Sequence, residues 1–297
     1  MKGLLKRILE KKGFTIVELL TVMAIMALLL GILVPALNMV RNQAKEVKQR
    51  AQTHSIEVAL EMYKNKMGDY PPSNWYDGDP AASPPIAYNG AMKLAEAMVG
   101  MDLLGQHIDS VFTLDGNDLD NNPLYPNDPC DDNLAARVGP FVKLENANAY
   151  KLKHIYNKTK LDAINVIWAE RYVLCDVFGT VRNIGQGPRT IGMPILYYKA
   201  DTRKTGHDAN DLVRNIYDWA DNAALLNLGV PPDGDVNHPL LGTGSTPSDY
   251  AKPFYNMTRN ENITTISKPY NEDSFFLISA GIDGRYGTPD DIFNISK

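Results

Sequence analysis

The first feature of the hydrophobic pattern is a long apolar run near the N-terminus. Residues 14–37 are almost all apolar and carry a single charged side chain, Glu18. A helix needs roughly 20 apolar residues to cross the hydrocarbon core of a bilayer. The pattern therefore predicts one transmembrane helix over residues 14–37.

Basic residues are concentrated on one side of this run. Residues 1–13 contain five Lys or Arg side chains and one acid, Glu10, and no basic residue stands immediately after Leu37. Positively charged flanks of a span stay in the cytoplasm. We therefore expect the N-terminus in the cytoplasm and the rest of the chain across the membrane.

Beyond Pro35 the apolar residues change to a helical spacing. They recur at steps of three and four residues with charged residues between them, which is typical of an amphipathic helix. The predicted apolar stripe consists of Val40, Ala44, Val47, Ala51, Ile56, Ala59, Leu60, Tyr63 and Met67. Gly68, followed closely by Pro71, is a helix stop signal. We therefore expect one helix of about 50 residues, whose amphipathic half (38–68) packs on a globular domain (69–297).

The predicted globular domain alternates short apolar runs with loops rich in Pro, Gly and Asp. Asn89 is a suitable N-cap for a short helix over 91–99. The other elements are expected as strands over 193–199 and 274–280, a strand or short helix over 166–175, a helix over 211–228 and a loop over 230–255. Together they predict an α+β domain with a small antiparallel sheet and long loops.

Composition limits the class of protein and of partner. The 297 residues are 44% hydrophobic and 22% charged, which is ordinary for a globular protein. The formal net charge is −5, and it becomes −9 without residues 1–13, whose own net charge is +4. An acidic domain without a basic stripe is poorly suited to phosphate backbones, so no nucleic-acid partner is expected. Cys130 and Cys175 are either one disulfide or two unrelated thiols.

Sequence motifs for catalysis are absent. The chain contains no Gly-x-x-x-x-Gly-Lys-Ser/Thr, no His-Glu-x-x-His, no Gly-x-Ser-x-Gly and no paired CxxC. Its five histidines are scattered without metal-ligand spacing and are predicted to lie on the surface or on a helix face. We therefore expect no enzymatic activity and no catalytic residue.

The segment Lys11-Lys12-Gly13-Phe14-Thr15-Ile16-Val17-Glu18 resembles the cleavage and methylation signature of type IV pilins and type II secretion pseudopilins. The resemblance implies that residues 1–13 are a leader, cut between Gly13 and Phe14 by a prepilin peptidase, and that Phe14 is then N-methylated. An ordinary signal peptide and a plain signal anchor are the alternatives. The first lacks an evident small-residue cleavage site after the apolar run, and the second does not explain the positions of Gly13 and Glu18.

An acid inside an apolar span is costly, so Glu18 needs an explanation. The new α-amino group of Phe14 is mostly protonated near neutral pH. The resemblance implies that Glu18 pairs with this ammonium on a neighbouring subunit, where a low dielectric makes the pair strong. The alternative is a carboxylate near the interface that snorkels to water. Gly31 and Pro35 are expected to kink the helix, either simply at the membrane exit or, as the resemblance implies, at a point that bends during assembly.

Three segments of the globular domain resemble the major pseudopilin of type II secretion. They are residues 176–179 (DVFG), 193–198 (MPILYY) and 276–284 (FLISAGIDG). The resemblance implies a pilin-like fold, with the long helix packed on the domain. The chain departs from that family in size, since about half of residues 71–270 has no visible counterpart.

Carboxylates and glycines are concentrated in the loop over residues 279–292. Calcium takes about six to eight oxygen ligands, which a sharply turning chain can supply. The resemblance implies a calcium ion held by Asp283, Asp290 and Asp291, and a solvated turn is the alternative. No other metal or cofactor is expected.

The resemblance implies a structural subunit of a type II secretion pseudopilus that polymerises through its N-terminal helix. The implied location is the inner membrane, single-pass, with the C-terminal domain in the periplasm or outside the cell in a filament. The implied partners are further copies of the chain, a prepilin peptidase and methyltransferase, an inner-membrane assembly platform, minor pseudopilins or pilins, and membrane lipid. The alternatives are a type IV pilus subunit for adhesion or motility, and a membrane-anchored binding protein or enzyme that does not polymerise.

Overall fold

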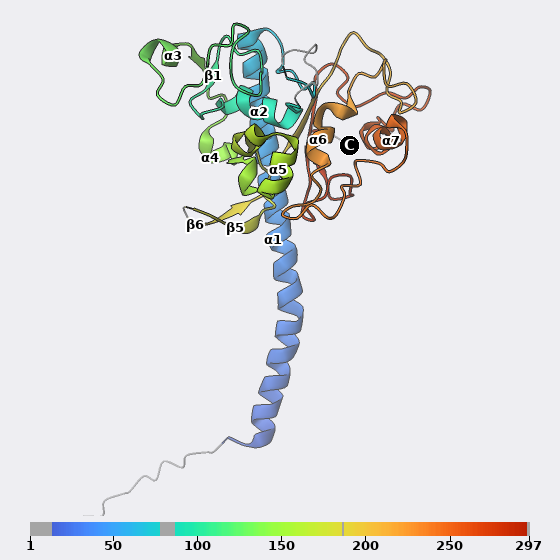
Figure 1. Ribbon diagram of the computed structural model, residues 1–297. Helices are drawn as coiled ribbons and strands as arrows, with labels where there is room; N and C mark the ends of the chain where they lie inside the picture. The colour runs from blue at the N-terminus through green and yellow to red at the C-terminus, as the bar shows by residue number, and fades with distance from the viewer. Residues whose placement is uncertain (1–13, 78–86, 186, 296–297) are drawn as a thin grey trace, which may run out of the picture. The chain divides into compact units, whose positions relative to one another are not determined.

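The computed structural model describes residues 14–77, 87–185 and 187–295 (Figure 1). The chain divides into two compact units, one ending at Ala44 and one running from Lys45, and each is described by itself. The long helix α1 (Ile16–Met67) contributes to both units. The predicted leader, including Gly13, lies outside the described residues.

The prediction of one long N-terminal helix is confirmed. α1 is continuous from Ile16 to Met67, and Gly68 after it has a φ of +92°. Glycine adopts this left-handed conformation without a steric penalty, which is why it ends helices so often. Gly31 and Pro35 lie inside α1, and the helix continues through both. The kink at these residues stays a prediction.

The first unit contains the apolar part of α1. Its large apolar side chains are exposed, from Phe14 (80%) to Val40 (62%). The most apolar 18-residue stretch of α1 contains no buried residue. By length and composition, this helix is able to cross a membrane.

The second unit includes the rest of α1. From Ile56 onward the predicted apolar stripe is confirmed, because Ile56, Ala59, Leu60 and Tyr63 are all buried. These side chains belong to the hydrophobic core of the unit. This part of α1 is therefore an amphipathic core helix, as its pattern indicates.

Before Ile56 the predicted stripe is wrong. Val47 is 64% exposed, whereas the polar residues Gln49 and Gln52 are buried. The reason is hydrogen bonding to a turn of the domain: Gln49 Oε1 accepts from the backbone N–H of Val177 (2.9 Å), and Gln52 Nε2 donates to the Cys175 carbonyl (2.9 Å). Backbone groups that are buried need such partners, so polar side chains replace apolar ones here.

Helices and strands of the second unit are short. The further helices are α2 (Gly90–Val99), α3 (Asp131–Ala135), α4 (Leu144–Ala147), α5 (Lys158–Ile164), α6 (Ala223–Leu226) and α7 (Pro247–Thr258), with 3-10 helices η1 (Leu152–His154), η2 (Val166–Glu170) and η3 (Trp219–Asn222). The strands are β1 (Gln106–His107), β2 (Arg137–Val138), β3 (Ala149–Lys151), β4 (Tyr172–Leu174), β5 (Thr180–Ile184), β6 (Gly187–Ile191), β7 (Leu196–Lys199), β8 (Phe275–Ser279) and β9 (Ile292–Phe293). The predicted α+β class is confirmed.

The strands form small antiparallel sheets. β7, β8 and β9 make a three-stranded sheet in that order, in which Tyr197 pairs with Leu277 and Ile278 pairs with Phe293. β1–β2, β3–β4 and β5–β6 are separate two-stranded pairs. The predicted strands over 193–199 and 274–280 are β7 and β8, and β8 is buried along its whole length.

Helix α2 lies in the core beside β4 and β7. The predicted N-cap is confirmed, since the Asn89 side chain accepts from the Met92 backbone N–H (3.1 Å). Every residue of α2 is buried, including two charged ones. Lys93 Nζ donates to the carbonyls of Asn74 and Tyr76 (2.8 Å each), and Glu96 accepts from three hydroxyl groups. Their burial is tolerated because each is hydrogen-bonded.

Two predicted segments of the second unit are wrong. The helix expected over 211–228 is helical only from Trp219 onward, because residues before it bridge to another loop through Gly206 and Asn215. The loop expected over 230–255 contains the start of α7. Its sequence signal is the capping box of Thr246 and Asp249, with Pro247 at the first helical position.

The buried carboxylate of Asp176 joins the three segments that resemble the major pseudopilin. Asp176 Oδ1 accepts from the backbone N–H groups of Phe178 (3.2 Å) and Met193 (3.1 Å), and Oδ2 accepts from the Ser279 hydroxyl (2.9 Å). Gly192 leaves room for it, because a Cβ there would lie 2.1 Å from Asp176 Oδ1. Burial raises the pKa of Asp176 to about 7. The turn after β4 is thereby fixed to β8.

Replacement of this carboxylate tests its structural role. Asp176→Ala leaves two buried N–H donors and one hydroxyl without their acceptor, so we expect the free energy of unfolding to fall by about 3 kcal/mol. Asp176→Asn keeps an acceptor oxygen and should lose less. Denaturant unfolding of the detergent-solubilised chain, followed by tryptophan fluorescence, measures both. The exposed Asp128→Ala is the control, and an Asp176→Ala loss no larger than that of the control would contradict this role.

Candidate functional site

Thr15 and Glu18 close the N-terminal end of α1. The Thr15 backbone N–H donates to Glu18 Oε2 (2.8 Å), and the Glu18 backbone N–H donates to Thr15 Oγ1 (3.2 Å). The Thr15 hydroxyl also donates to Glu18 Oε2 (2.7 Å). This reciprocal arrangement is a capping box. The sequence signal for this capping box is the Thr-x-x-Glu spacing. Glu18 therefore has a local role in capping α1, besides the role in assembly that the sequence predicts.

Phe14 and Glu18 are both exposed in the single subunit. Over the described ranges 14–77, 87–185 and 187–295, the hydrogen-bond partner of the Glu18 carboxylate is Thr15, and no basic side chain pairs with it. The carboxylate therefore keeps its negative charge accessible to a cation from outside the subunit. Phe14, the predicted first residue after cleavage, lies directly before the capping box.

The C-terminal loop turns on glycines in left-handed conformations. Gly281, Gly284 and Gly287 have φ values of +65°, +69° and +94°. At Gly281 the turn is also sterically closed, since a Cβ would lie 2.3 Å from the Asp290 carbonyl oxygen. Glycine is therefore required for the two ends of the loop to approach each other.

The structure brings Asp283, Asp290 and Asp291 into one turn. The backbone N–H of Asp283 donates to Asp290 Oδ2 (3.0 Å), and Asp283 Oδ1 accepts from the backbone N–H of Arg285 (2.8 Å). Asp291 Oδ2 accepts from the backbone N–H of Gly287 (2.7 Å). Much of the hydrogen-bonding capacity of these carboxylates is therefore used inside the loop.

Asp291 has one oxygen that the loop does not satisfy. Its Oδ1 is buried and has no hydrogen-bond partner among the residues that the structure describes. Burial, and to a smaller degree the nearby carboxylates of Asp290 and Asp283, raise the pKa of Asp291 to about 7, against the opposing effect of the Gly287 N–H. An orphaned buried oxygen beside two other carboxylates is a setting that a cation would stabilise. The donor set therefore fits calcium chemically.

A metal site that is already formed would need these carboxylates to converge on one point. Within the described part of the chain, no group of three or more His, Cys, Asp or Glu side chains has the geometry to hold a metal ion. Asp283, Asp290 and Asp291 thus share a loop but do not converge on one point. Calcium at these residues stays a prediction.

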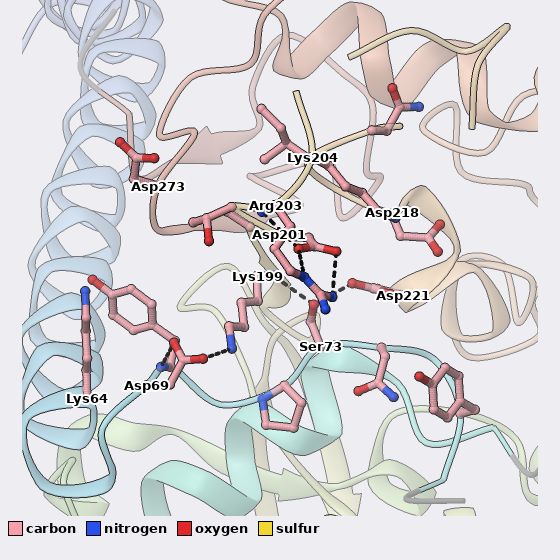
Figure 2. A pocket seen from close by; sticks show the side chains of 18 residues that line it. Lys64, Asp69, Ser73, Lys199, Asp201, Arg203, Lys204, Asp218, Asp221 and Asp273 are labelled. Atoms are coloured by element: carbon pink, nitrogen blue, oxygen red, sulfur yellow. Dashed lines mark hydrogen bonds and ion pairs between the residues drawn. The ribbon is translucent and has the colours of Figure 1, made fainter. Parts of the chain in front are cut away.

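The sequence did not reveal one large cleft of the second unit. It has a volume of about 800 Å³ and lies between residues that follow α1, residues that follow β7 and the loop before η3 (Figure 2). Lys199 Nζ pairs with Asp69 Oδ2 (2.5 Å), and Arg203 Nε pairs with Asp201 Oδ1 (2.9 Å). These segments are far apart in sequence, so no local pattern could indicate their meeting.

Asp221 is the buried acid of this cleft. Its Oδ2 accepts from the Ser73 hydroxyl (2.5 Å), as Figure 2 shows. Burial, and then the charge of nearby Asp218, raise the pKa of Asp221 to about 8. Since it takes up a proton near neutral pH, this acid is not a fixed negative charge. Two of the basic side chains of the cleft, Lys199 and Arg203, are paired with acids.

Histidines and cysteines differ from the sequence expectation in part. Placement of every histidine on the surface or a helix face is wrong for His107, His207 and His238, which are buried in loops or a short strand. Cys130 is exposed, Cys175 is buried, and both are free thiols. Of the two alternatives for the cysteines, the structure therefore has unrelated thiols.

Comparison with known proteins gives one match. The family described as prokaryotic N-terminal methylation motif matches residues 10–34. No curated protein and no solved structure matches the chain. The matched segment contains the predicted cleavage position, Glu18 and most of the apolar run.

The raised pKa of Asp291 predicts a pH effect on stability. Because this pKa is above the ordinary value of 3.8, the favourable contribution is complete at low pH and is lost as the pH rises towards about 7. The side chain of the Asp291→Asn variant cannot ionise. The unfolding free energy of this variant should therefore fall less, as the pH rises from about 3.8 to about 7, than that of the unchanged chain. Unfolding in chelator-containing buffer measures this, with the exposed Asp273→Asn as control. Equal pH slopes in the Asp291→Asn and unchanged chains would contradict the prediction.

Proposed function

The methylation motif at residues 10–34 and the long apolar helix behind it are consistent with the type IV pilin and pseudopilin family, and from this premise we propose a structural subunit of a type II secretion pseudopilus. The subunit is cut after Gly13 and methylated on Phe14. It is held in the inner membrane by α1, with its C-terminal domain in the periplasm. Subunits then polymerise through their N-terminal helices.

The observation that carries this proposal is the apolar surface of α1 behind the motif. Large apolar side chains from Phe14 to Val40 are exposed. Such a surface is stable only in lipid or against other apolar surfaces, because its exposure to water is unfavourable. A membrane before assembly and a bundle of like helices after assembly both supply that cover. A methylation motif on such a helix supports processing followed by polymerisation.

In this proposal, a charge pair of Glu18 determines how each subunit aligns with its neighbour. In the filament core, its carboxylate pairs with the methylated α-ammonium of Phe14 on a neighbouring subunit. The carboxylate has no basic partner of its own among the described side chains, since its hydrogen bonds come from Thr15. Leaving either charge unpaired in an apolar core is strongly unfavourable. The pair therefore selects one axial register for each added subunit.

The hydrogen bonds of the Asp176 carboxylate favour a pseudopilus over a surface pilus. The three segments that resemble the major pseudopilin meet there through hydrogen bonds of one buried carboxylate. The alternative, a type IV pilus subunit for adhesion or motility, is favoured by the size of the domain. A membrane-anchored binding protein that does not polymerise is the alternative of another class.

Calcium in the C-terminal loop is a second part of the proposal. Asp283, Asp290 and Asp291 would hold the ion, and the orphaned Oδ1 of Asp291 supports this role. When bound, calcium would neutralise three carboxylates that now repel one another. The expected partners in assembly remain the peptidase and methyltransferase, the assembly platform, minor subunits and membrane lipid.

Substitution at Glu18 separates assembly from processing. Glu18→Gln removes the negative charge that pairs with the neighbouring ammonium, so we expect cleavage after Gly13 to continue and filament formation to fall at least tenfold, the effect of about 1.4 kcal/mol. Thr15→Ala removes the capping box but keeps the Glu18 carboxylate, and it is the matched control. Cross-linking in intact cells, followed by immunoblotting of the cross-linked multimers in the membrane fraction, gives the measurement. Normal assembly of Glu18→Gln would overturn the pairing.

The N-terminus and location of the mature chain separate the alternatives. In cells with native expression, mass spectrometry of the membrane and sheared surface fractions should find methylated Phe14 confined to the membrane. Methylated Phe14 in sheared surface fibres would instead assign a type IV pilus. An uncut Met1 in a working protein would sink both filament proposals and leave the plain anchor.

Calcium should raise the thermal stability of the detergent-solubilised chain. We expect the midpoint of unfolding to rise by several degrees in calcium relative to chelator, because an ion that binds the folded state stabilises it by mass action. Asp290→Asn together with Asp291→Asn should abolish the shift, and Asp115→Asn, in another acidic loop, should retain it. An unchanged midpoint in calcium, in magnesium and in chelator would exclude the ion.

A further inference from the structure

A second pocket lies beside α7 and the C-terminal loop. It has a volume of about 520 Å³, within the range of small-molecule sites. It is lined by residues 237–239 and 241–243, by Asp249, Lys252, Pro253 and Asn256 of α7, and by Arg285. Two basic side chains line the pocket from different parts of the chain: Lys252 belongs to α7, and Arg285 belongs to the C-terminal loop.

Arg285 enters this pocket with unused hydrogen-bond donors. Its Nε is buried and has no partner among the residues that the structure describes. Its terminal nitrogen approaches the Asn237 carbonyl only at 3.5 Å, a long contact. Lys252 is exposed on α7 and makes no ion pair with a described residue within 4 Å. Lys252 lies near enough to the Asp249 carboxylate to help lower its pKa, so Arg285 is the cation of this pocket whose donors are left over among the described residues.

His238 adds a neutral side chain to the same wall. It is 1% exposed, and its Nδ1 accepts from the Tyr286 backbone N–H (3.3 Å). Because Nδ1 accepts, the neutral ring carries its hydrogen on Nε2. Burial lowers the pKa of His238 to about 4, with a smaller opposing effect of the Gly229 carbonyl. Its N–H interacts with the Gly229 carbonyl, so His238 contributes a neutral ring to the pocket wall and not a spare donor.

The single carboxylate of the pocket is already occupied. Asp249 Oδ2 accepts from the backbone N–H groups of Ser245 (3.2 Å) and Thr246 (3.0 Å) and from the Thr246 hydroxyl (2.8 Å). These bonds form the capping box of α7. Asp249 therefore does not consume the donors of Arg285. In the larger cleft of Figure 2, by contrast, the side chains of Lys199 and Arg203 are paired with acids.

We propose that this pocket binds a small organic anion, of the size of a monosaccharide, through a carboxylate or phosphate group. Arg285 and Lys252 bind the charged group, because charge-assisted hydrogen bonds from such cations are the strong ones. The buried, neutral ring of His238 forms part of the wall beside these cations. Asn237, Asn256 and Thr243 face the remaining polar atoms of the ligand. The proposal does not depend on the filament function.

The test is calorimetric titration of the full-length chain in detergent with three probes. Glucuronate carries the carboxylate on a sugar, inorganic phosphate carries the other anion, and glucose is the neutral control. We expect glucuronate, phosphate or both to bind and glucose to give no heat. Arg285→Gln should weaken binding at least about tenfold, the effect of one lost charge-assisted hydrogen bond. Lys252→Gln should weaken it severalfold, and this exposed residue is not needed for folding.

The matched control is Arg203→Gln, an 88% exposed arginine side chain that pairs with Asp201 in the other cleft. Its binding should equal that of the unchanged chain. Glucuronate binding with this pattern assigns an acidic sugar, and phosphate binding alone with this pattern assigns a phosphorylated ligand. The proposal is overturned if neither anion binds, if glucose binds as well as glucuronate, or if Arg203→Gln weakens binding as much as Arg285→Gln. Equal unfolding midpoints of all three variants exclude misfolding as the cause.

Discussion

The second unit depends on one buried turn, at residues 175–178, where four elements are tied together. Gln49 and Gln52 bring α1 to it by hydrogen bonds to the Val177 N–H and the Cys175 carbonyl. From its other side, the Asp176 carboxylate binds the Met193 N–H before β7 and the Ser279 hydroxyl in β8. Buried polar groups are costly when they are unpaired, and these hydrogen bonds pair several of them at once, so the turn favours this arrangement of helix and strands.

This constraint explains which parts of the fold the sequence could predict. The helix end at Gly68, the Asn89 cap of α2 and strand β8 each follow from residues close together in the chain, and all three are confirmed. Burial of Gln49 and Gln52 could not be predicted this way. Their partners lie more than 100 residues away in the sequence, at separations of 128 and 123. Apolar periodicity indicates which face of a helix is able to be buried. In α1, however, hydrogen bonds to a turn that is remote in sequence determine which residues are buried.

The same distinction applies to the candidate sites. The methylation motif is a local pattern, and the family comparison finds it at residues 10–34. The carboxylates of the C-terminal loop are also close in sequence, and they do share one turn. The cleft at Asp221 and the pocket at Arg285 are assembled from distant segments. α7, which lines the pocket, does carry a local signal in its capping box, so a closer reading of Thr246 and Asp249 would have found that helix.

Backbone hydrogen bonds connect the carboxylates of the C-terminal loop with the wall of the pocket at Arg285. The Arg285 backbone N–H donates to Asp283 Oδ1, while the next N–H, of Tyr286, donates to His238 Nδ1. Through two successive residues, the turn that holds the carboxylates is therefore hydrogen-bonded to His238 in the wall of the pocket. An ion that orders the carboxylates reduces the freedom of Arg285, so it lowers the entropy loss when an anion binds there. By thermodynamic linkage, an anion in the pocket must favour the cation to the same degree.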